Sequence, residues 1–238
     1  MFVRAVLFDY GGTLDGGVHW LERFAQLYRA SGFALPFERL RAAFDYATRC
    51  AYDDPGAAEL DLQALVEYHV ARQSEHLGLS NAAVAGIVAE FVRASRAGLD
   101  DSRIVLARLH GRAALGVISN FYGNVHRILD EAKLAPLLTI IIDSAVVGVK
   151  KPDPEIFALA VRRIGCEPAQ ALYVGDSFEN DVVGAHAAGL RTAWLVGTVE
   201  RPCRLPECVD IRLRRLADLD GILDTLQDEG APAARRLS

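Results

Sequence analysis

Short apolar runs, each followed by a glycine or a polar residue, are the feature that most constrains how this chain can fold. They span residues 3–8, 114–118, 140–142, 171–174 and 192–196. A nearly continuous apolar run of this length is typical of a strand that is buried on both faces, as in a parallel sheet. We therefore expect a strand at each of these places, spread over almost the whole chain.

Helical patterns lie between these runs. Asp153 is placed to cap a helix that has Pro154 as its first residue and ends at Gly165. A further helix is predicted over residues 180–188, because Gly189 suits the left-handed conformation that ends many helices. This alternation of strands and helices predicts an α/β fold, a doubly wound, Rossmann-like parallel sheet with helices on both faces.

Residues 16–97 predict a separate helical domain. They contain no strand-like run of Val and Ile, and their apolar residues recur at helical spacing, as Leu21, Phe24 and Tyr28 do. We expect an α/β core made of residues 1–15 and 98–225, with an α-helical cap of residues 16–97 inserted after the first strand. A frayed tail is expected over residues 226–238.

Charge and composition exclude several classes of function. The 238 residues carry a formal net charge of −5 and no long basic run, which argues against a nucleic-acid or anionic-membrane partner. No stretch approaches about 18 uninterrupted apolar residues, so no segment is expected to span a membrane. Asp9 stands too early for a secretory signal. The four cysteines are mostly far apart and complete no zinc motif, so we expect reduced thiols and a cytoplasmic protein.

Polar side chains collect where the predicted strands end. Because ligands bind beyond the carboxyl ends of parallel strands, these residues should share one edge of the sheet. Crowded carboxylates repel one another unless a cation joins them, and a few hard oxygen ligands suit Mg²⁺. The pattern predicts an acidic Mg²⁺ site beside a hydroxyl and a lysine. Its candidate residues are Asp9, Ser119, Asn120, Lys150, Lys151, Asp176 and Asp181.

Four motifs in this order resemble those of the haloacid dehalogenase superfamily of hydrolases, over nearly the whole chain. Each is weak to moderate alone, and their order and their places at strand ends make the combination specific. The roughly 100 residues between the first two motifs match the place where many members carry a helical cap. The motifs are Asp9-Tyr10-Gly11-Gly12-Thr13-Leu14, Ile118-Ser119-Asn120, Lys151-Pro152-Asp153-Pro154, and Gly175-Asp176-Ser177-Phe178-Glu179-Asn180-Asp181 with Gly184-Ala185 after it.

The resemblance implies a nucleophile and a metal site. Asp9 would attack phosphorus and form an aspartyl-phosphate. The Asp9 side chain, the Gly11 main-chain carbonyl and the Asp176 side chain would hold Mg²⁺. Asp181 would hold a metal-bound water or orient Lys151.

The resemblance also implies contacts to substrate. Ser119 would donate to a phosphoryl oxygen with help from Asn120, and Gly12 is assigned to substrate binding as well. Lys151 would pair with Asp9 and with the charge that develops during phosphoryl transfer.

One position departs from the family pattern. Most phosphatases of the family carry a second aspartate two residues after the nucleophile, as a general acid and base, and here that residue is Gly11. Asp15 and His19 are the nearby groups that can replace it. Members without this aspartate include the dehalogenases, which work without metal and replace the Gly-Asp of the fourth motif, whereas this chain keeps Gly175 and Asp176. The phosphonoacetaldehyde hydrolases need a cap lysine, and residues 16–97 contain none.

The sequence therefore predicts an Mg²⁺-dependent hydrolase that removes phosphate from a small phosphorylated metabolite. The alternative is a weakly catalytic or non-catalytic relative that binds a phosphometabolite or a protein, because Gly11 replaces the usual acid. A 2-haloacid dehalogenase is the less favoured third reading. The sequence leaves a monomer and a homodimer both open.

Overall fold

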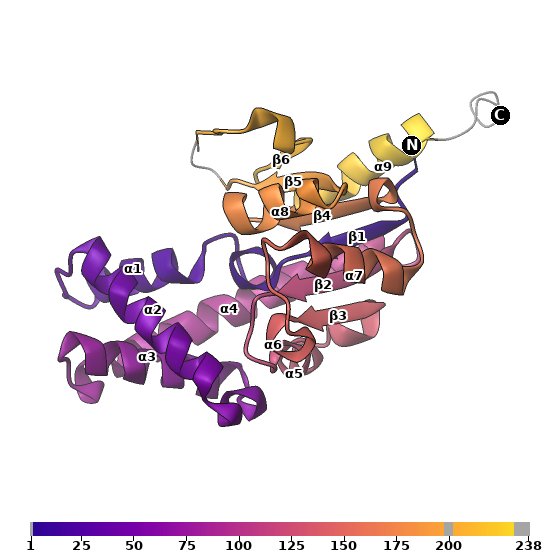
Figure 1. Cartoon of the computed structure of the whole chain (residues 1–238). Coiled ribbons are helices and arrows are strands. Elements are labelled where there is room, and N and C mark those ends of the chain that lie inside the picture. Colours follow the sequence, from indigo (N-terminus) through magenta and orange to yellow (C-terminus); the bar gives the residue numbers. More distant parts are fainter. Residues whose placement is uncertain (1, 198–201, 231–238) are drawn as a thin grey trace.

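A six-stranded parallel sheet forms the centre of the part of the molecule that the structure describes (Figure 1). The computed structural model describes residues 2–197 and 202–230. Every neighbouring pair of strands is parallel, in the order β3-β2-β1-β4-β5-β6, so the predicted doubly wound sheet is confirmed. The strands are β1 (Ala5–Phe8), β2 (Ala114–Ser119), β3 (Ile140–Asp143), β4 (Ala171–Gly175), β5 (Arg191–Leu195) and β6 (Ile211–Leu213).

The strand order determines where a site can form. From β1 the chain adds β2 and β3 on one side, then returns to add β4, β5 and β6 on the other. The winding direction thus reverses between β1 and β4, and ligands of doubly wound sheets bind in the crevice beyond the carboxyl ends at such a point. Asp9 directly follows β1 and Asp176 directly follows β4.

Helices cover both faces of the sheet. Along β1, Val6 and Phe8 pack into one apolar core with residues of α4, α5 and α9, whereas Ala5 and Leu7 pack into a second core with residues of α7. This alternation follows from the two-residue period of a strand. The helices are α1 (Trp20–Ala30), α2 (Phe37–Asp53), α3 (Leu62–Leu77), α4 (Asn81–Leu109), α5 (Val125–Glu131), α6 (Ser144–Val147), α7 (Pro154–Ile164), α8 (Gly184–Ala187) and α9 (Leu219–Gly230).

The helix after the lysine motif forms as its end signals predict. The Asp153 carboxylate accepts a hydrogen bond from the Glu155 N–H, Pro154 is the first residue of α7, and Gly165 ends it in the left-handed conformation. The helix predicted over residues 180–188 consists of a π-helical turn, Phe178–Val183, followed by α8. Gly189, with φ of 79°, ends it.

Helices α1, α2 and α3 lie together beyond the ends toward which the strands point (Figure 1). Helix α4 runs from this group of helices to the side of the sheet (Figure 1). The expected boundary between cap and core, between residues 97 and 98, therefore falls inside a continuous helix. Gly98 allows the close packing of α4 on the main chain after β1, because an added Cβ would lie 2.5 Å from the carbonyl of Asp15. The division into cap and core stays a prediction.

The C-terminal part differs from the sequence-based expectation. Strand β6 was not expected, and it adds the edge strand beside β5. The expected frayed tail from residue 226 is wrong as far as residue 230, because α9 continues to Gly230 and buries Leu219, Leu223 and Leu226. Residues 231–238 lie outside the described part of the chain.

No helix in the described ranges is long and apolar enough to cross a membrane. The four cysteines Cys50, Cys166, Cys203 and Cys208 form no disulfide. A reduced state of these thiols and a cytoplasmic location stay predictions.

A buried histidine lies at the centre of the aromatic cluster that fills the space between α1 and α3. The Nε2 of His69 is 3.0 Å from the Tyr122 hydroxyl, and the rings of Trp20, Phe24 and Phe44 surround it at centroid distances of 5.8, 6.4 and 5.8 Å. Burial in these apolar surroundings lowers the pKa of His69 to about 4. The histidine is therefore a neutral core residue at neutral pH.

This lowered pKa predicts a loss of stability in mild acid. In the unfolded chain His69 titrates near its ordinary pKa of about 6.5, so below that pH the unfolded state binds a proton that the folded state does not. The free energy of unfolding should fall as the pH drops from about 6.5 to about 4, by about 3 kcal/mol in total from this residue. Urea denaturation across this range should show a smaller pH slope for His69→Phe than for the parent.

His76 provides the matched control, because it is exposed near the end of the same helix. The His76→Asn variant should keep the pH slope of the parent. Equal slopes for the parent and His69→Phe would contradict the assignment of a buried neutral imidazole.

Candidate active site

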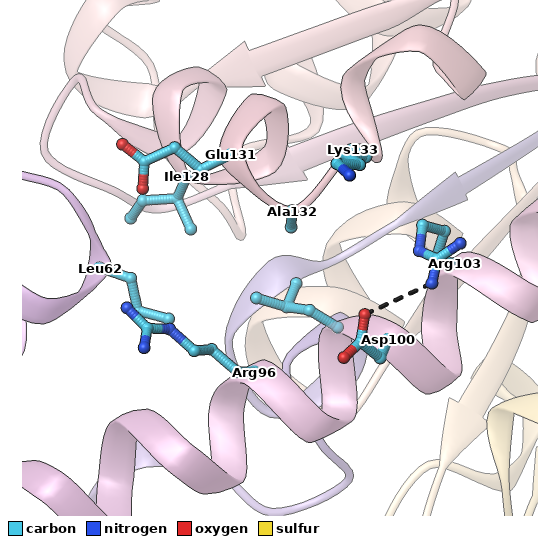
Figure 2. Close-up of a pocket in the computed structure, with 9 residues that line it drawn as sticks. Leu62, Arg96, Asp100, Arg103, Ile128, Glu131, Ala132 and Lys133 are labelled. Atoms are coloured by element: carbon cyan, nitrogen blue, oxygen red, sulfur yellow. Dashed lines mark hydrogen bonds and ion pairs between the residues drawn. The ribbon is translucent and has the colours of Figure 1, made fainter.

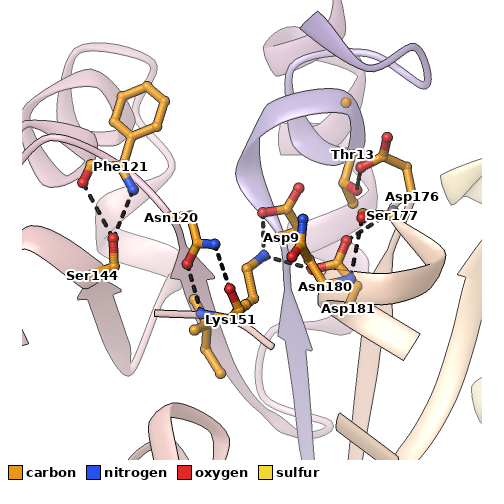
Figure 3. Close-up of polar contacts among 12 residues, drawn as sticks. Asp9, Thr13, Asn120, Phe121, Ser144, Lys151, Asp176, Ser177, Asn180 and Asp181 are labelled. Atoms are coloured by element: carbon orange, nitrogen blue, oxygen red, sulfur yellow. Dashed lines mark hydrogen bonds and ion pairs between the residues drawn. The ribbon is translucent and has the colours of Figure 1, made fainter. Parts of the chain in front are cut away.

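The predicted acidic residues meet at the carboxyl edge of the sheet. Asp9 and Asp176 come from the ends of the adjacent strands β1 and β4, and Asp181 lies in the turn Phe178–Val183 that follows (Figure 3). One oxygen from each of the three carboxylates lies within 4.8 Å of the others, and all three residues are buried. The structure thus brings together three side chains from positions as far apart in the chain as 9 and 181.

Lys151 connects the nucleophile candidate to Asp181. Its Nζ donates to Asp9 Oδ1 at 2.6 Å and to Asp181 Oδ1 at 2.6 Å (Figure 3). It also donates to the Tyr173 hydroxyl at 2.9 Å. Burial lowers the pKa of Lys151, but the two carboxylates outweigh burial and raise the pKa above its ordinary value. The lysine therefore remains a fixed positive charge beside Asp9.

The carboxylates are crowded enough to resist ionisation. Burial, reinforced by the charge of Asp181 and opposed by Lys151, raises the pKa of Asp9 to about 7. Burial and the charges of Asp9 and Asp181 raise the pKa of Asp176 well above its ordinary value. A divalent cation removes this repulsion, and buried carboxylate and carbonyl oxygens are the ligands that Mg²⁺ prefers. The carboxylates of Asp9, Asp176 and Asp181 form a donor set that fits Mg²⁺, and the Gly11 carbonyl as a further ligand stays a prediction.

Gly12 makes room for Asp176. Its φ is 91°, and an added Cβ would lie 2.6 Å from the Asp176 Oδ2. The Gly12 N–H donates to Asp15 Oδ1 at 2.7 Å, and the assignment of Gly12 to substrate binding stays a prediction. In the structure this glycine serves close packing.

Asp181 is held by protein donors. Its Oδ2 accepts from the Ser177 N–H at 2.9 Å, and its Oδ1 accepts from the Tyr173 hydroxyl at 3.2 Å as well as from Lys151. An added Cβ at Gly175 would lie 2.4 Å from the Asp181 carboxyl carbon. Of the two roles that the sequence left open for Asp181, these contacts favour the orientation of Lys151.

Ser119 and Asn120 lie beside Lys151, as expected from the end of β2. Both line the cavity of about 110 Å³ that also reaches Asp9 and Asp176. The Asn120 side chain makes two reciprocal bonds to the main chain of Lys151: it accepts from the Lys151 N–H at 2.8 Å and donates to the Lys151 carbonyl at 2.9 Å. Asn120 thus holds the lysine loop in place, and its contact with substrate stays a prediction.

A second cavity, of about 390 Å³, lies away from this chemistry, between α4 and the end of α5 (Figure 2). Arg96, Asp100 and Arg103 line it from α4, and Glu131 and Lys133 line it from the other side. It contains none of the residues that the sequence singled out. The cavity at the sheet edge, which Asp9, Lys151 and Asp176 line, is therefore the candidate active site.

Asp15, one of the two expected substitutes for the missing acid, is fully engaged elsewhere. It is completely buried and its carboxylate accepts from the Gly12 N–H, from Trp20 Nε1 at 2.7 Å, from Arg23 Nη1 at 3.1 Å and from Ser95 Oγ at 3.2 Å. Because a charged arginine and three further donors point at it, Asp15 is a buried carboxylate that organises the loop after β1.

His19, the other expected substitute, caps α1 and lines the cavity. Its Nδ1 accepts a hydrogen bond from the Leu21 N–H at 3.2 Å, which fixes the ring at the start of this helix.

Trp20 occupies the space next to Gly11. Gly11 has φ of −80° and ψ of 110°, a conformation open to any residue, and an added Cβ would meet the Trp20 Nε1 at 3.4 Å. The indole also lines the cavity. An aromatic side chain from α1 thus lies where a longer side chain at position 11 would extend.

The sequence did not identify two residues that shape the site, Tyr173 and Arg23. Tyr173 belongs to a run that predicts a buried strand, and nothing in its apolar neighbours signals that its hydroxyl contacts Lys151 and Asp181. Arg23 reaches Asp15 across eight positions, and it follows Trp20 on a helix whose surface arginines look the same in sequence. A charged residue among apolar positions of an amphipathic helix was the available signal.

The parallel fold and the buried lysine–carboxylate group define an α/β enzyme site, and the family follows from the sequence. The model of the haloacid dehalogenase-like hydrolases matches residues 3–189, so the chain belongs to this family.

Relatives of known activity include phosphatases. Over 83 residues the chain is 37% identical to the phosphoserine phosphatase of Thermus thermophilus. This match covers 34% of this chain and 33% of that protein. In such matches the chain spans only about a third of the length of its curated relatives.

Solved structures with the same fold include a phosphatase and a dehalogenase. A HAD phosphatase from Thermococcus onnurineus matches with a TM-score of 0.55 and 23% identity, over 93% of this chain and 98% of that one. A 2-haloacid dehalogenase from Pseudomonas syringae matches with a TM-score of 0.53 and 23% identity, over 94% and 99%. At these identities the likeness concerns the fold.

The Asp15–Arg23 pair yields a stability prediction. The Arg23→Met variant should lose about 3–5 kcal/mol of the free energy of unfolding, because it leaves the Asp15 charge buried without its partner. Adding Asp15→Asn to it should recover part of the loss, since no charge then remains buried. Urea denaturation measures both effects.

Arg29→Met on the exposed side of the same helix is the control and should change the free energy of unfolding by no more than about 0.5 kcal/mol. A stability of Arg23→Met equal to that of the control would show that this ion pair does not hold the loop.

Proposed function

We propose that the chain is an Mg²⁺-dependent phosphatase that acts on a small phosphorylated metabolite through an aspartyl-phosphate. The observation that carries the proposal is the buried Lys151, whose Nζ lies 2.6 Å from Asp9 and from Asp181 beside the third carboxylate, Asp176. The phosphoserine phosphatase among the relatives supports the phosphatase chemistry. We further propose that the protein works in the cytoplasm.

The chain's own residues would divide the reaction as follows. An oxygen of Asp9 attacks phosphorus, the bond between phosphorus and the leaving oxygen breaks, and the phosphoryl group becomes attached to Asp9. Lys151, fixed by Asp181 and Tyr173, orients Asp9 and faces the negative charge that develops on the phosphoryl group. Ser119 lines the cavity and would donate to a phosphoryl oxygen. Bound Mg²⁺ would supply further positive charge against the phosphoryl oxygens.

Two other functions fit less well. Three buried carboxylates within 4.8 Å of one another are unfavourable for a dehalogenase, which attacks a carboxylate-bearing substrate without a metal to offset their charge. A protein that only binds a phosphometabolite has no use for a lysine held against Asp9, since a neutral side chain would bind an anion better than a carboxylate does.

The nucleophile is tested by Asp9→Asn. The amide has the same shape but does not attack phosphorus, so the variant should stay folded and bind inorganic phosphate in the presence of Mg²⁺ while turnover falls by roughly 10⁴-fold or more. Hydrolysis of 4-nitrophenyl phosphate measures turnover, and circular dichroism checks the fold. The exposed Asp45→Asn should keep the activity of the parent. Parent-like turnover by Asp9→Asn would rule out the covalent mechanism.

The metal is tested by chelation and by Asp176→Asn. EDTA should abolish hydrolysis and added Mg²⁺ should restore it. Asp176→Asn should raise the half-saturating Mg²⁺ concentration by about tenfold or more, since loss of a direct ligand weakens binding at least as much as loss of an outer partner. Mg²⁺ titrations of activity and calorimetry measure this shift. Release of chloride from 2-chloropropionate that survives EDTA would instead favour a dehalogenase.

A further inference from the structure

The cavity at Asp9 lacks a group that is ready to protonate a leaving oxygen, among the residues that the structure describes. The oxygen that leaves phosphorus must either take a proton as the bond breaks or depart as an anion. The titratable residues that line the cavity are Asp9, His19, Tyr122, Lys151, Asp176 and Asp181. Each of them is committed to another arrangement.

The charged members belong to the phosphoryl-transfer group itself. Asp9 is the nucleophile, Asp176 belongs to the metal group, and Asp181 accepts from Ser177, Tyr173 and Lys151. Lys151 directs its protons at three acceptors within 2.6 to 2.9 Å, two of them carboxylates, and so does not release one to substrate.

The remaining two members are engaged with other groups of the protein. The Tyr122 hydroxyl is buried and 3.0 Å from His69 Nε2, and burial raises the pKa of Tyr122 well above its ordinary value. The Nδ1 of His19 accepts from the Leu21 N–H, so this ring is held in place as the cap of α1.

The first turn offers no carboxylic acid either. Position 11 is glycine, and the Trp20 indole fills the neighbouring space. Asp15 is buried behind that indole and accepts from Trp20, Arg23, Ser95 and Gly12. The wall of the cavity around Gly11 is therefore aromatic and main chain where an acid would have to stand.

We infer that the substrate is a phosphoryl compound whose leaving oxygen departs as a stabilised anion: an acyl phosphate, or a phosphate ester of an enol or a phenol. This inference rests on the proposed function and names its substrate class. In the step, an Asp9 oxygen forms a bond to phosphorus while the bond to the leaving oxygen breaks, and that oxygen keeps the electron pair. No proton moves at this stage, and the released carboxylate, enolate or phenolate takes one later from water.

The test is a leaving-group series measured on the parent protein with Mg²⁺. The series runs from acetyl phosphate and 4-nitrophenyl phosphate through phenyl phosphate to glycerol 1-phosphate. The ratio kcat/KM reports the steps up to the transfer to Asp9, so a later slow step does not obscure it. The parent should lose kcat/KM steeply along the series. The gap between 4-nitrophenyl phosphate and glycerol 1-phosphate should be roughly 10²–10⁴-fold, the contribution of the absent acid.

A carboxylic acid placed at position 11 should reduce this dependence. Gly11→Asp keeps the main-chain carbonyl and has an allowed backbone conformation, and it should raise kcat/KM for glycerol 1-phosphate much more than for 4-nitrophenyl phosphate. Gly11→Asn is the matched control, because it has the same shape and no acidic proton, and it should leave the steep dependence unchanged. The parent series alone decides the inference if the aspartate variant is unstable.

The outcomes separate the two proposals. If the kcat/KM of the parent for glycerol 1-phosphate lies within about tenfold of that for 4-nitrophenyl phosphate, the site contains an acid. That result overturns this inference and leaves the proposed phosphatase function intact. A steeper series for His19→Asn than for the parent identifies His19 as that acid and overturns it too. If no member of the series is hydrolysed, acetyl phosphate included, the proposed phosphatase function itself fails.

Discussion

The contact of Lys151 with Asp9 and Asp181 is the interaction on which the rest of the site depends. Three carboxylates at the end of a buried sheet would repel one another and resist ionisation. The lysine offsets part of that charge, and it reaches this place because Asn120 holds its main chain at two points. A hydrogen-bonded chain therefore runs from the loop after β2 through Lys151 to the loops after β1 and β4. It holds Asp9 in place through contacts that begin at the ends of three strands.

A second buried charge pair fixes the other side of the same loop. Arg23 contacts the Asp15 carboxylate and three main-chain carbonyls of the loop after β1, and its Nη1 also donates to Ser95 on α4. Gly98 then allows α4 to approach the main chain of Asp15. The loop that carries Asp9 and Gly11 is thus held between the sheet and the first and fourth helices, so mutations far from the cavity can displace the nucleophile.

The sequence predicted what depends on local pattern. The strands, the ends of α7 and the polar residues after β1, β2 and β4 follow from apolar runs, caps and strand-end chemistry, and the structure brings Asp9, Lys151, Asp176 and Asp181 together. It missed contacts that depend on where side chains meet in three dimensions, such as that of Tyr173 with Lys151. It also missed β6, three residues whose strand character depends on pairing with β5.

The loss of an acid at position 11 has a consequence for how the two chemistries of the family relate. A halide leaves carbon as an anion without a proton, and an acyl or aryl oxygen can leave phosphorus in the same way. Under the proposed mechanism, Asp9 attacks without help from an acid at position 11, which suits either departure. The fold is shared by a phosphatase and a dehalogenase of known structure. What then selects phosphorus over carbon is the charge around Asp9, because a phosphoryl group brings more negative charge than a haloacid does. Under the proposed mechanism, Asp176 and Asp181 beside Asp9 would hold a divalent cation that meets this charge, and we propose that this group of carboxylates favours phosphoryl transfer.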